Sequence, residues 1–198
     1  HSDAYYHEVV EAYENGFTNV THLYSGCSLL RRKNSYRFLG VVESAFLIDG
    51  LNVEIIADGC HLPPELIKLI YKIKGPDRII IVSDSIMAAG EPEGEYILGN
   101  ENSGRKIIVE DGVAKLPDRL SFAGSVATAD RLIRTAYKSA GLPLQEVVGM
   151  MTVNPAKLLG VYGKLGVIAK DAAADLVIFD DDINIQKVYV NGIDVNRS

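Results

Sequence analysis

The sequence has few cysteines, little basic charge and no long apolar run. Its 198 residues contain two cysteines and no Cys-x-x-Cys pair, which argues against a disulfide framework and a structural zinc knuckle. No apolar stretch approaches the roughly 20 residues that cross a bilayer. Lys and Arg number 20 against 26 Asp and Glu, a net charge of −6, and no basic stripe could neutralise a phosphate backbone. We therefore expect a cytoplasmic protein without a nucleic-acid or membrane partner.

The composition that remains is that of an ordinary globular domain. Apolar residues make up 47% of the chain and charged residues 23%, which is enough to form a real core. The chain opens at His1 rather than at a methionine, and a helical pattern starts directly after a Ser2-Asp3 cap. We expect the strand that delivers His1 to lie upstream of this sequence.

The first half of the chain alternates short apolar strands with longer helices. The helix that follows the Ser2-Asp3 cap is expected to end at Asn15-Gly16, and a second helix is expected to run from Pro63-Pro64 to Gly75-Pro76. The predicted strands cover residues 17–23, 52–57 and 78–82. In the last of these, the residues after Arg78 are all apolar, as in strands buried on both faces. This order predicts an α/β fold with a parallel sheet.

The second half changes character twice. Asp111-Gly112 between two apolar stretches predicts a tight hairpin within an insertion over about residues 96–118. Helices are expected to start at Thr128, Pro143 and Asn154-Pro155. Strands are expected over 175–179 and 186–190. We expect one unit over residues 1–160 and the strands of a small β domain over 161–198.

Polar residues follow the predicted strands where each strand ends. Thr21-His22 follow the first strand, Asp58 and His61 the second, and Ser83-Asp84 the third. Strand ends of this kind meet on the carboxyl face of a (β/α) barrel, where active sites lie. Two imidazoles suit a divalent transition metal, and a carboxylate can serve as ligand or base. His1 would end a fourth strand, and we expect a further ligand upstream.

Seven motifs then run in order along nearly the whole chain: HSDA (1–4), THLY (21–24), IADGCH (56–61), VSDSIMAAG (82–90), FAGS (122–125), NPAKLLG (154–160) and ADLVIFD (174–180). Together they resemble the C-terminal half of the N-acetylglucosamine-6-phosphate deacetylases of the amidohydrolase superfamily. The resemblance implies the C-terminal half of a metal-dependent (β/α)8 TIM-like barrel, together with strands of a small β-sandwich. The complete protein would be a homodimer.

The resemblance also implies roles for individual residues. His1 and His22 fall on metal ligands, Asp84 on the catalytic aspartate and His61 on a histidine that contacts the substrate. The metal would be zinc, with iron, manganese, cobalt or nickel as alternatives. Asp84 would take a proton from an activated water and return it to the sugar nitrogen, while the metal or His61 stabilises the oxyanion. The products would be acetate and glucosamine-6-phosphate, a step of amino-sugar catabolism.

The chain departs from the family pattern where the substrate's phosphate is held. Ser25-Gly26-Cys27 replace the usual Asn-Ala-Met, and Arg37 stands where the family arginine precedes Glu-Pro-Gly. We expect Arg37, His61, Ser25 and Gly26 to contact the phosphate, with the basic run 31–33 either helping or forming a solvated loop.

Several residues keep two readings. Gly124 either approaches the acetyl group with its backbone or forms a turn, and Asp58 either acts itself or orients the loop that carries His61. Cys27 and Cys60 fit buried thiols better than metal ligands.

Two rival functions also remain open. One is an amidohydrolase for another acylated amino sugar or a cyclic amide, and the other is a non-catalytic sugar-phosphate-binding protein. The 198 residues alone are expected to be inactive and prone to associate, because half a barrel exposes strand edges.

Overall fold

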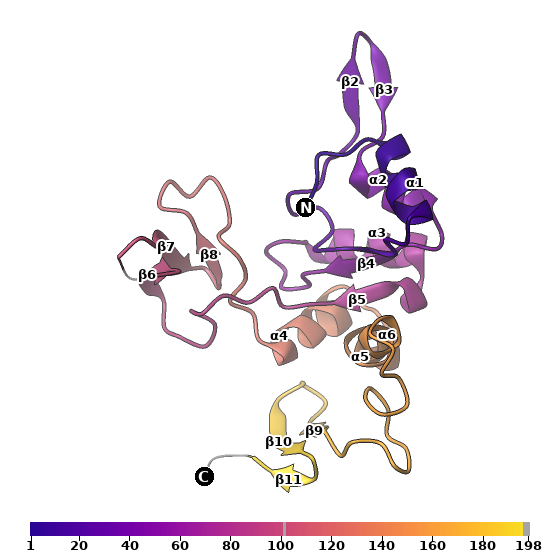
Figure 1. Cartoon of the computed structure of the whole chain (residues 1–198). Coiled ribbons are helices and arrows are strands. Elements are labelled where there is room, and N and C mark those ends of the chain that lie inside the picture. Colours follow the sequence, from indigo (N-terminus) through magenta and orange to yellow (C-terminus); the bar gives the residue numbers. More distant parts are fainter. Residues whose placement is uncertain (101, 196–198) are drawn as a thin grey trace.

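The computed structural model describes residues 1–100 and 102–195. In chain order the elements are α1 (Tyr6–Glu14), β1 (Asn19–Val20), β2 (Arg31–Lys33), β3 (Tyr36–Phe38), α2 (Val41–Leu47), β4 (Asn52–Ile55), α3 (Pro64–Lys74), the 3-10 turn η1 (Pro76–Arg78), β5 (Ile79–Ile81), β6 (Gly94–Leu98), β7 (Arg105–Glu110), β8 (Val113–Lys115), α4 (Ala129–Arg134), the π-helical η2 (Thr135–Ser139), α5 (Leu144–Met151), α6 (Val153–Leu158), β9 (Leu176–Phe179), β10 (Ile185–Val190) and β11 (Ile193–Asp194). Figure 1 shows their arrangement. Among the described residues, no helix is both long and apolar enough to cross a membrane.

The strands β1, β4 and β5 form a three-stranded parallel sheet in the order β1-β4-β5. The predicted parallel sheet is thus confirmed, although its strands are shorter than expected. Backbone hydrogen bonds continue beyond the strand ends, from Leu23 N–H to Glu54 O at 2.7 Å and from Val82 N–H to Ile55 O at 3.0 Å. The residues that follow β1 and β5 therefore continue in the direction of the strands before the chain turns away.

The helices that cover this sheet follow from their apolar faces and their end signals. In α3, Pro63 is the N-cap, Ile67 and Ile70 are buried, and Gly75 ends the helix with φ +70°. Pro suits a helix start and Gly a left-handed end. Ile67 and Ile70 join the main core with Ile55, Ile79 and Met150, as their spacing predicts.

The start of α1 corrects the sequence prediction. The cap is Tyr5, not Ser2-Asp3, and the Glu8 carboxylate accepts the Tyr5 N–H at 2.7 Å. Ser2 instead accepts the N–H of Ala4 at 3.1 Å and forms an isolated parallel bridge with Cys27. The first residues thus run extended beside the segment after β1.

Two features between β1 and β4 were not predicted. The strands β2 and β3 form an antiparallel hairpin that pairs Arg32 with Arg37, and it projects from the body of the protein (Figure 1). Its charged residues show no apolar alternation, so the sequence favours a solvated loop. Helix α2 follows, with Val41, Val42 and Ala45 buried.

The insertion after β5 is an antiparallel sheet in the order β6-β7-β8. The predicted tight hairpin is confirmed at Asp111-Gly112, where φ is +54° and +71°. This sheet has a small core of its own that includes Ile107 and Val109. The chain returns by pairing Ser125 beside Ser85, so the insertion is attached next to the end of β5.

The last third of the chain packs helices on the sheet and ends in a small antiparallel sheet, β9-β10-β11. The predicted helix starts at Thr128 and Pro143 are confirmed as N-caps. The third helix begins one residue earlier than predicted, at Val153. Arg134 ties the small sheet to α4 by donating to Asp182 O at 3.0 Å and to Ile183 O at 2.8 Å.

Asn154, the first residue of the NPAKLLG motif, has a structural role in joining two elements. Its buried side-chain amide donates to Pro76 O and Ile79 O, each at 2.7 Å, and so fastens α6 to the start of β5. Asn154→Ala leaves these carbonyls without their donor and should lower the free energy of unfolding by about 2 kcal/mol. Urea denaturation measures it. Asn15→Ala, which removes a comparable but exposed bond to Glu11 O, should change stability by less than about 0.5 kcal/mol; equal losses would contradict the assignment.

Candidate active site

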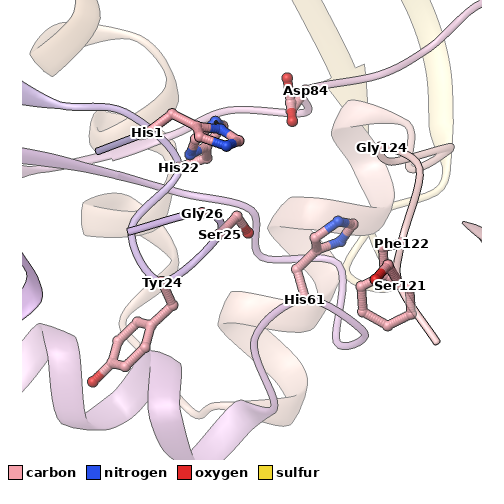
Figure 2. Close-up of a pocket in the computed structure, with 10 residues that line it drawn as sticks. All are labelled: His1, His22, Tyr24, Ser25, Gly26, His61, Asp84, Ser121, Phe122 and Gly124. Carbon is pink, nitrogen blue, oxygen red and sulfur yellow. Dashed lines mark hydrogen bonds between the residues drawn. The ribbon is translucent and has the colours of Figure 1, made fainter. Parts of the chain in front are cut away.

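A cavity of about 460 Å³ opens at the carboxyl ends of the parallel strands (Figure 2). Its lining residues are His1, His22, Tyr24, Ser25, Gly26, His61, Asp84, Ser121, Phe122 and Gly124. All the site residues predicted from the sequence therefore meet in one place, with the exception of Arg37. His22 and Asp84, which are 62 positions apart, are brought together because the parallel strands β1 and β5 deliver their ends to the same edge.

The two histidines predicted as metal ligands lie against each other. His1 Nδ1 and His22 Nε2 are 3.4 Å apart, and the rings meet edge to face. Two nitrogens bound at about 2.0–2.1 Å to one tetrahedral zinc ion lie about 3.3–3.4 Å apart. The observed spacing therefore fits two ligands of a single ion. Within the described residues no group of three His, Cys, Asp or Glu side chains could hold a metal.

The backbone at His22 and Asp84 has an uncommon conformation. Both residues have positive φ, +25° and +48°, which disfavours a residue with a Cβ atom. Such strain persists where the surroundings enforce it, and it clusters at functional sites. Asp84 O accepts the N–H of Ser125 at 3.2 Å, which holds this backbone in place. The Asp84 side chain is exposed toward the cavity and faces the two histidines (Figure 2).

Asp58 and His61 form a buried pair on the next strand end. The side chain of Asp58 is fully buried and that of His61 is 6% exposed, with Asp58 Oδ2 at 2.7 Å from His61 Nδ1. Asp58 Oδ1 also accepts the backbone N–H of Cys60 at 2.8 Å and of His61 at 2.7 Å. Burial alone would raise the pKa of the Asp58 carboxyl, but the hydrogen bonds from His61 and Cys60 outweigh it and lower the pKa.

This pair fixes the orientation of the His61 ring. An ionised carboxylate only accepts hydrogen bonds, so Nδ1 carries the proton and Nε2 is left for the cavity. Of the two readings of Asp58, the geometry favours the one in which it orients the loop.

The insertion supplies the opposite wall. Phe122 packs on the His61 ring with centroids 4.8 Å apart, and Ser121 and Gly124 lie beside it (Figure 2). The sequence analysis did not assign Tyr24, Ser121 or Phe122 to the site. Tyr24 and Phe122 do stand inside two of the quoted motifs, which is the signal that could have identified them.

Gly26 is required by the position of His1. With φ +60°, a Cβ atom at this position would overlap the His1 ring. A residue without a side chain is therefore needed for His1 to lie beside His22. This gives a physical reason for glycine in the segment that departs from the family pattern.

Arg37 is the one predicted site residue that lies elsewhere. It is exposed in β3, opposite Arg32 in the projecting hairpin, and it does not line the cavity. The residues between Cys27 and Arg37 pair with one another as a hairpin rather than wrapping the cavity mouth. Its contact with a phosphate stays a prediction.

Comparison with known proteins agrees with this geometry. The model of the amidohydrolase family matches residues 1–194, and the chain belongs to this family, whose members generally depend on a divalent metal. Within the family it is similar to N-acetylglucosamine-6-phosphate deacetylases. That of Lysinibacillus sphaericus is 33% identical over 192 residues, which cover 97% of this chain and 47% of the relative.

Two further matches bear on fold and substrate. The crystal structure of N-acetylglucosamine-6-phosphate deacetylase from Thermotoga maritima has a TM-score of 0.88 and 32% identity, covering 100% of this chain and 52% of that one. N-acetylgalactosamine-6-phosphate deacetylase of Escherichia coli O157:H7 is 28% identical over 192 residues, 97% of this chain and 48% of the relative. The resemblance inferred from the motifs is thus confirmed. The chain spans about half the length of these relatives.

The buried pair predicts a pH-dependent contribution of Asp58 to stability. Because the pKa of Asp58 is lower in the folded protein than in the unfolded chain, the ionised carboxyl stabilises the fold above about pH 4, and this contribution is lost as the pH falls through the depressed pKa. Asp58→Asn should therefore cost about 2 kcal/mol at pH 7 and less at pH 3. Denaturant titrations at both pH values measure this difference.

The control for this prediction is Asp3→Asn. It breaks an ion pair with Arg31 in which the Asp3 side chain is 93% exposed, and it should have almost no effect at either pH. A cost for Asp58→Asn that is equal at pH 3 and pH 7 would contradict the assigned role of the carboxylate.

Proposed function

We propose that the protein containing this chain is a metal-dependent hydrolase that removes the acetyl group from N-acetylglucosamine-6-phosphate, giving glucosamine-6-phosphate and acetate in amino-sugar catabolism. The observation that carries the proposal is the convergence of His1, His22, His61 and Asp84 on one cavity. A sugar-phosphate-binding protein without catalysis needs no exposed carboxylate opposite a pair of metal-binding imidazoles.

We further propose that the parallel strands β1, β4 and β5 are consecutive strands of a (β/α)8 barrel. Residues 1–160 would then form its C-terminal part and residues 161–198 would contribute to a small β-sandwich. The helices α2 and α3, which join the strands, and the antiparallel order β9-β10-β11 support this division. Residues 196–198 of the second unit lie outside the described residues.

His1 and His22 would hold the divalent metal, which we propose to be zinc, with iron, manganese, cobalt or nickel as alternatives. The 3.4 Å between their ring nitrogens supports this assignment, and a further ligand would complete the set. A bound metal lowers the pKa of its water and polarises the amide carbonyl.

Asp84 is the proton carrier in this proposal. Its carboxylate accepts a proton from the attacking water and delivers it to the sugar nitrogen as the C–N bond breaks. The bonds from Ser125 to Asp84 O and from Ile86 N–H to Ser125 O hold the aspartate's backbone while its side chain stays exposed. The same carboxylate thus serves as base and then as acid.

The substrate's phosphate and acetyl group would lie among the remaining lining residues. The Ser25 hydroxyl and the Gly26 backbone N–H would donate to the phosphate, and the Gly124 backbone would approach the acetyl group. His61 would contact the substrate through Nε2, which accepts a hydrogen bond in the tautomer that Asp58 fixes. The Escherichia coli relative named for the galactosamine epimer makes a second acylated amino sugar a candidate. Both epimers should therefore be assayed side by side.

Location and assembly are also proposals. Both cysteines are free thiols, which supports a reducing cytoplasmic setting. We propose a homodimer for the complete protein, which size-exclusion chromatography with light scattering would test.

Replacing the proposed proton carrier should abolish turnover. Asp84→Asn keeps the size of the side chain but cannot accept the proton, so kcat should fall at least about 100-fold with the metal retained. Acetate release is the measurement. The control is Asp77→Asn in η1, at the other end of β5, which should keep nearly full activity. A near-normal rate for Asp84→Asn would assign the proton transfer to another group.

Removing a proposed ligand should release the metal. His22→Ala should lower the metal content from about one ion per subunit to a small fraction, because a catalytic zinc usually has three protein ligands. Elemental analysis measures this independently of activity. His7→Ala, which alters an exposed histidine stacked on Tyr5, should leave the content unchanged. Full metal content in His22→Ala would refute the ligand assignment.

A further inference from the structure

Arg131, on the first turn of α4, joins two segments that are distant in sequence. Its Nη2 donates to Asp58 O at 2.9 Å and lies 3.3 Å from Cys60 Sγ, and its Nη1 donates to Gly112 O at 2.6 Å. Asp58 and Cys60 belong to the loop that carries His61, whereas Gly112 is in the turn between β7 and β8. One guanidinium thus bridges the His61 loop and the insertion.

On the side of the His61 loop, this contact acts on the same residue that orients the imidazole. The Asp58 carboxylate holds His61 Nδ1 and two backbone N–H groups, while Arg131 holds the Asp58 carbonyl. The loop between β4 and α3 therefore has both the side chain and the backbone of Asp58 anchored. Any displacement of Asp58 moves the His61 ring with it.

On the side of the insertion, the turn held by Arg131 is internally braced. Lys115 bonds Asp111 at 2.7 Å and Glu110 at 3.2 Å, and Arg119 bonds Glu110 at 2.8 Å. These bonds connect the turn to the segment after β8. That segment carries Phe122, which pairs with Lys115 as an isolated bridge and packs on His61.

We propose that Arg131 is a positioning residue for substrate binding: it clasps the His61 loop to the β7–β8 turn, so that the His61 ring and the Phe122 side chain covering it keep one fixed relation. The inference rests on the proposed function, in which His61 contacts the substrate. Arg131 itself does not line the cavity and acts through the two backbone carbonyls it holds.

The clasp depends on the shape of the guanidinium as well as on its charge. Two nitrogens of a rigid fork donate in different directions to two carbonyls, which a single ammonium cannot reproduce. Lysine at this position keeps the charge but loses the bridge. Arg131→Lys therefore separates a role in geometry from a role in electrostatics.

The first test is steady-state kinetics on the complete, metal-loaded protein. Arg131→Gln should raise KM for the acetylated sugar phosphate at least about tenfold and leave kcat within about threefold, since binding rather than proton transfer is disturbed. Arg131→Lys should show most of the same defect. Arg134→Gln is the matched control, because Arg134 clasps two carbonyls from the same helix but on the small C-terminal sheet.

The second test, hydrogen exchange followed by mass spectrometry, is independent of activity. Arg131→Gln should speed exchange at least about fivefold in peptides covering residues 58–61 and 110–113, because the clasp restrains local opening there. Arg134→Gln should instead speed exchange near residues 180–184. Both variants are measured under identical conditions, so each serves as the other's reference.

A substitution at Gly112 should displace the Arg131 guanidinium without changing Arg131 itself. At Gly112 an added Cβ would lie 2.7 Å from Arg131 Nη1, whereas at Gly99, which also has positive φ, the nearest atom is 3.7 Å away. Gly112→Ala should therefore reproduce the KM and exchange changes. Gly99→Ala carries comparable backbone strain in the same insertion and should not.

Three results would each overturn the proposal. The first is unchanged exchange in residues 58–61 for Arg131→Gln and Gly112→Ala. The others are an unchanged KM despite faster exchange, and a wild-type KM in Arg131→Lys. If the wild-type protein deacetylates neither sugar phosphate, the proposed function fails. The exchange data then decide on the clasp alone, with faster exchange supporting it and unchanged exchange refuting it.

Discussion

The pairing of β4 with a parallel strand on each side is the constraint on which the site depends. Parallel register sends the ends of β1, β4 and β5 to the same edge, and the hydrogen bonds from Leu23 to Glu54 and from Val82 to Ile55 carry this register past the strands. His22, Asp58 and Asp84 therefore lie within a few residues of a bonded ladder. The side chains proposed for metal binding and proton transfer, His22 and Asp84, take their separation from the sheet.

The features that depend only on residues close together in the chain could be predicted from the sequence. Apolar runs ended by polar residues identified the strands and the edge where His22, His61 and Asp84 meet, because both signals are short-range. The clasp of Arg131 could not be predicted, since it contacts Asp58 across 73 positions and the residue sits on a helix where an arginine is ordinarily solvated. The boundaries of β1 were also misjudged, because the ladder beyond Val20 continues without a regular strand.

Arg37 shows that a motif match does not by itself place a residue at the cavity. Its distance from Phe38-Leu39-Gly40 fits the family pattern, but the longer segment before it folds on itself as β2 and β3. A match of motifs along the sequence uses only the spacing between residues. It does not show that the residues before Arg37 pair with one another as a hairpin. A cross-strand pair of arginines at 32 and 37 is repulsive, which adds to the physical reasons why this hairpin was not predicted from the charge pattern.

The parallel sheet alone does not complete the site, because the segment that returns from the insertion holds the backbone of Asp84 and covers His61. The positive φ at Asp84 is maintained by pairing with Ser125, and Gly124 is held so closely that a Cβ there would overlap Ile86. Phe122 from the same segment covers His61. The proposed base and the proposed substrate contact therefore both depend on the one segment that returns from the insertion. Because strain at Asp84 persists only while that segment stays in place, loosening the insertion should disturb proton transfer and substrate binding together, whereas loosening the Arg131 clasp disturbs only the His61 side.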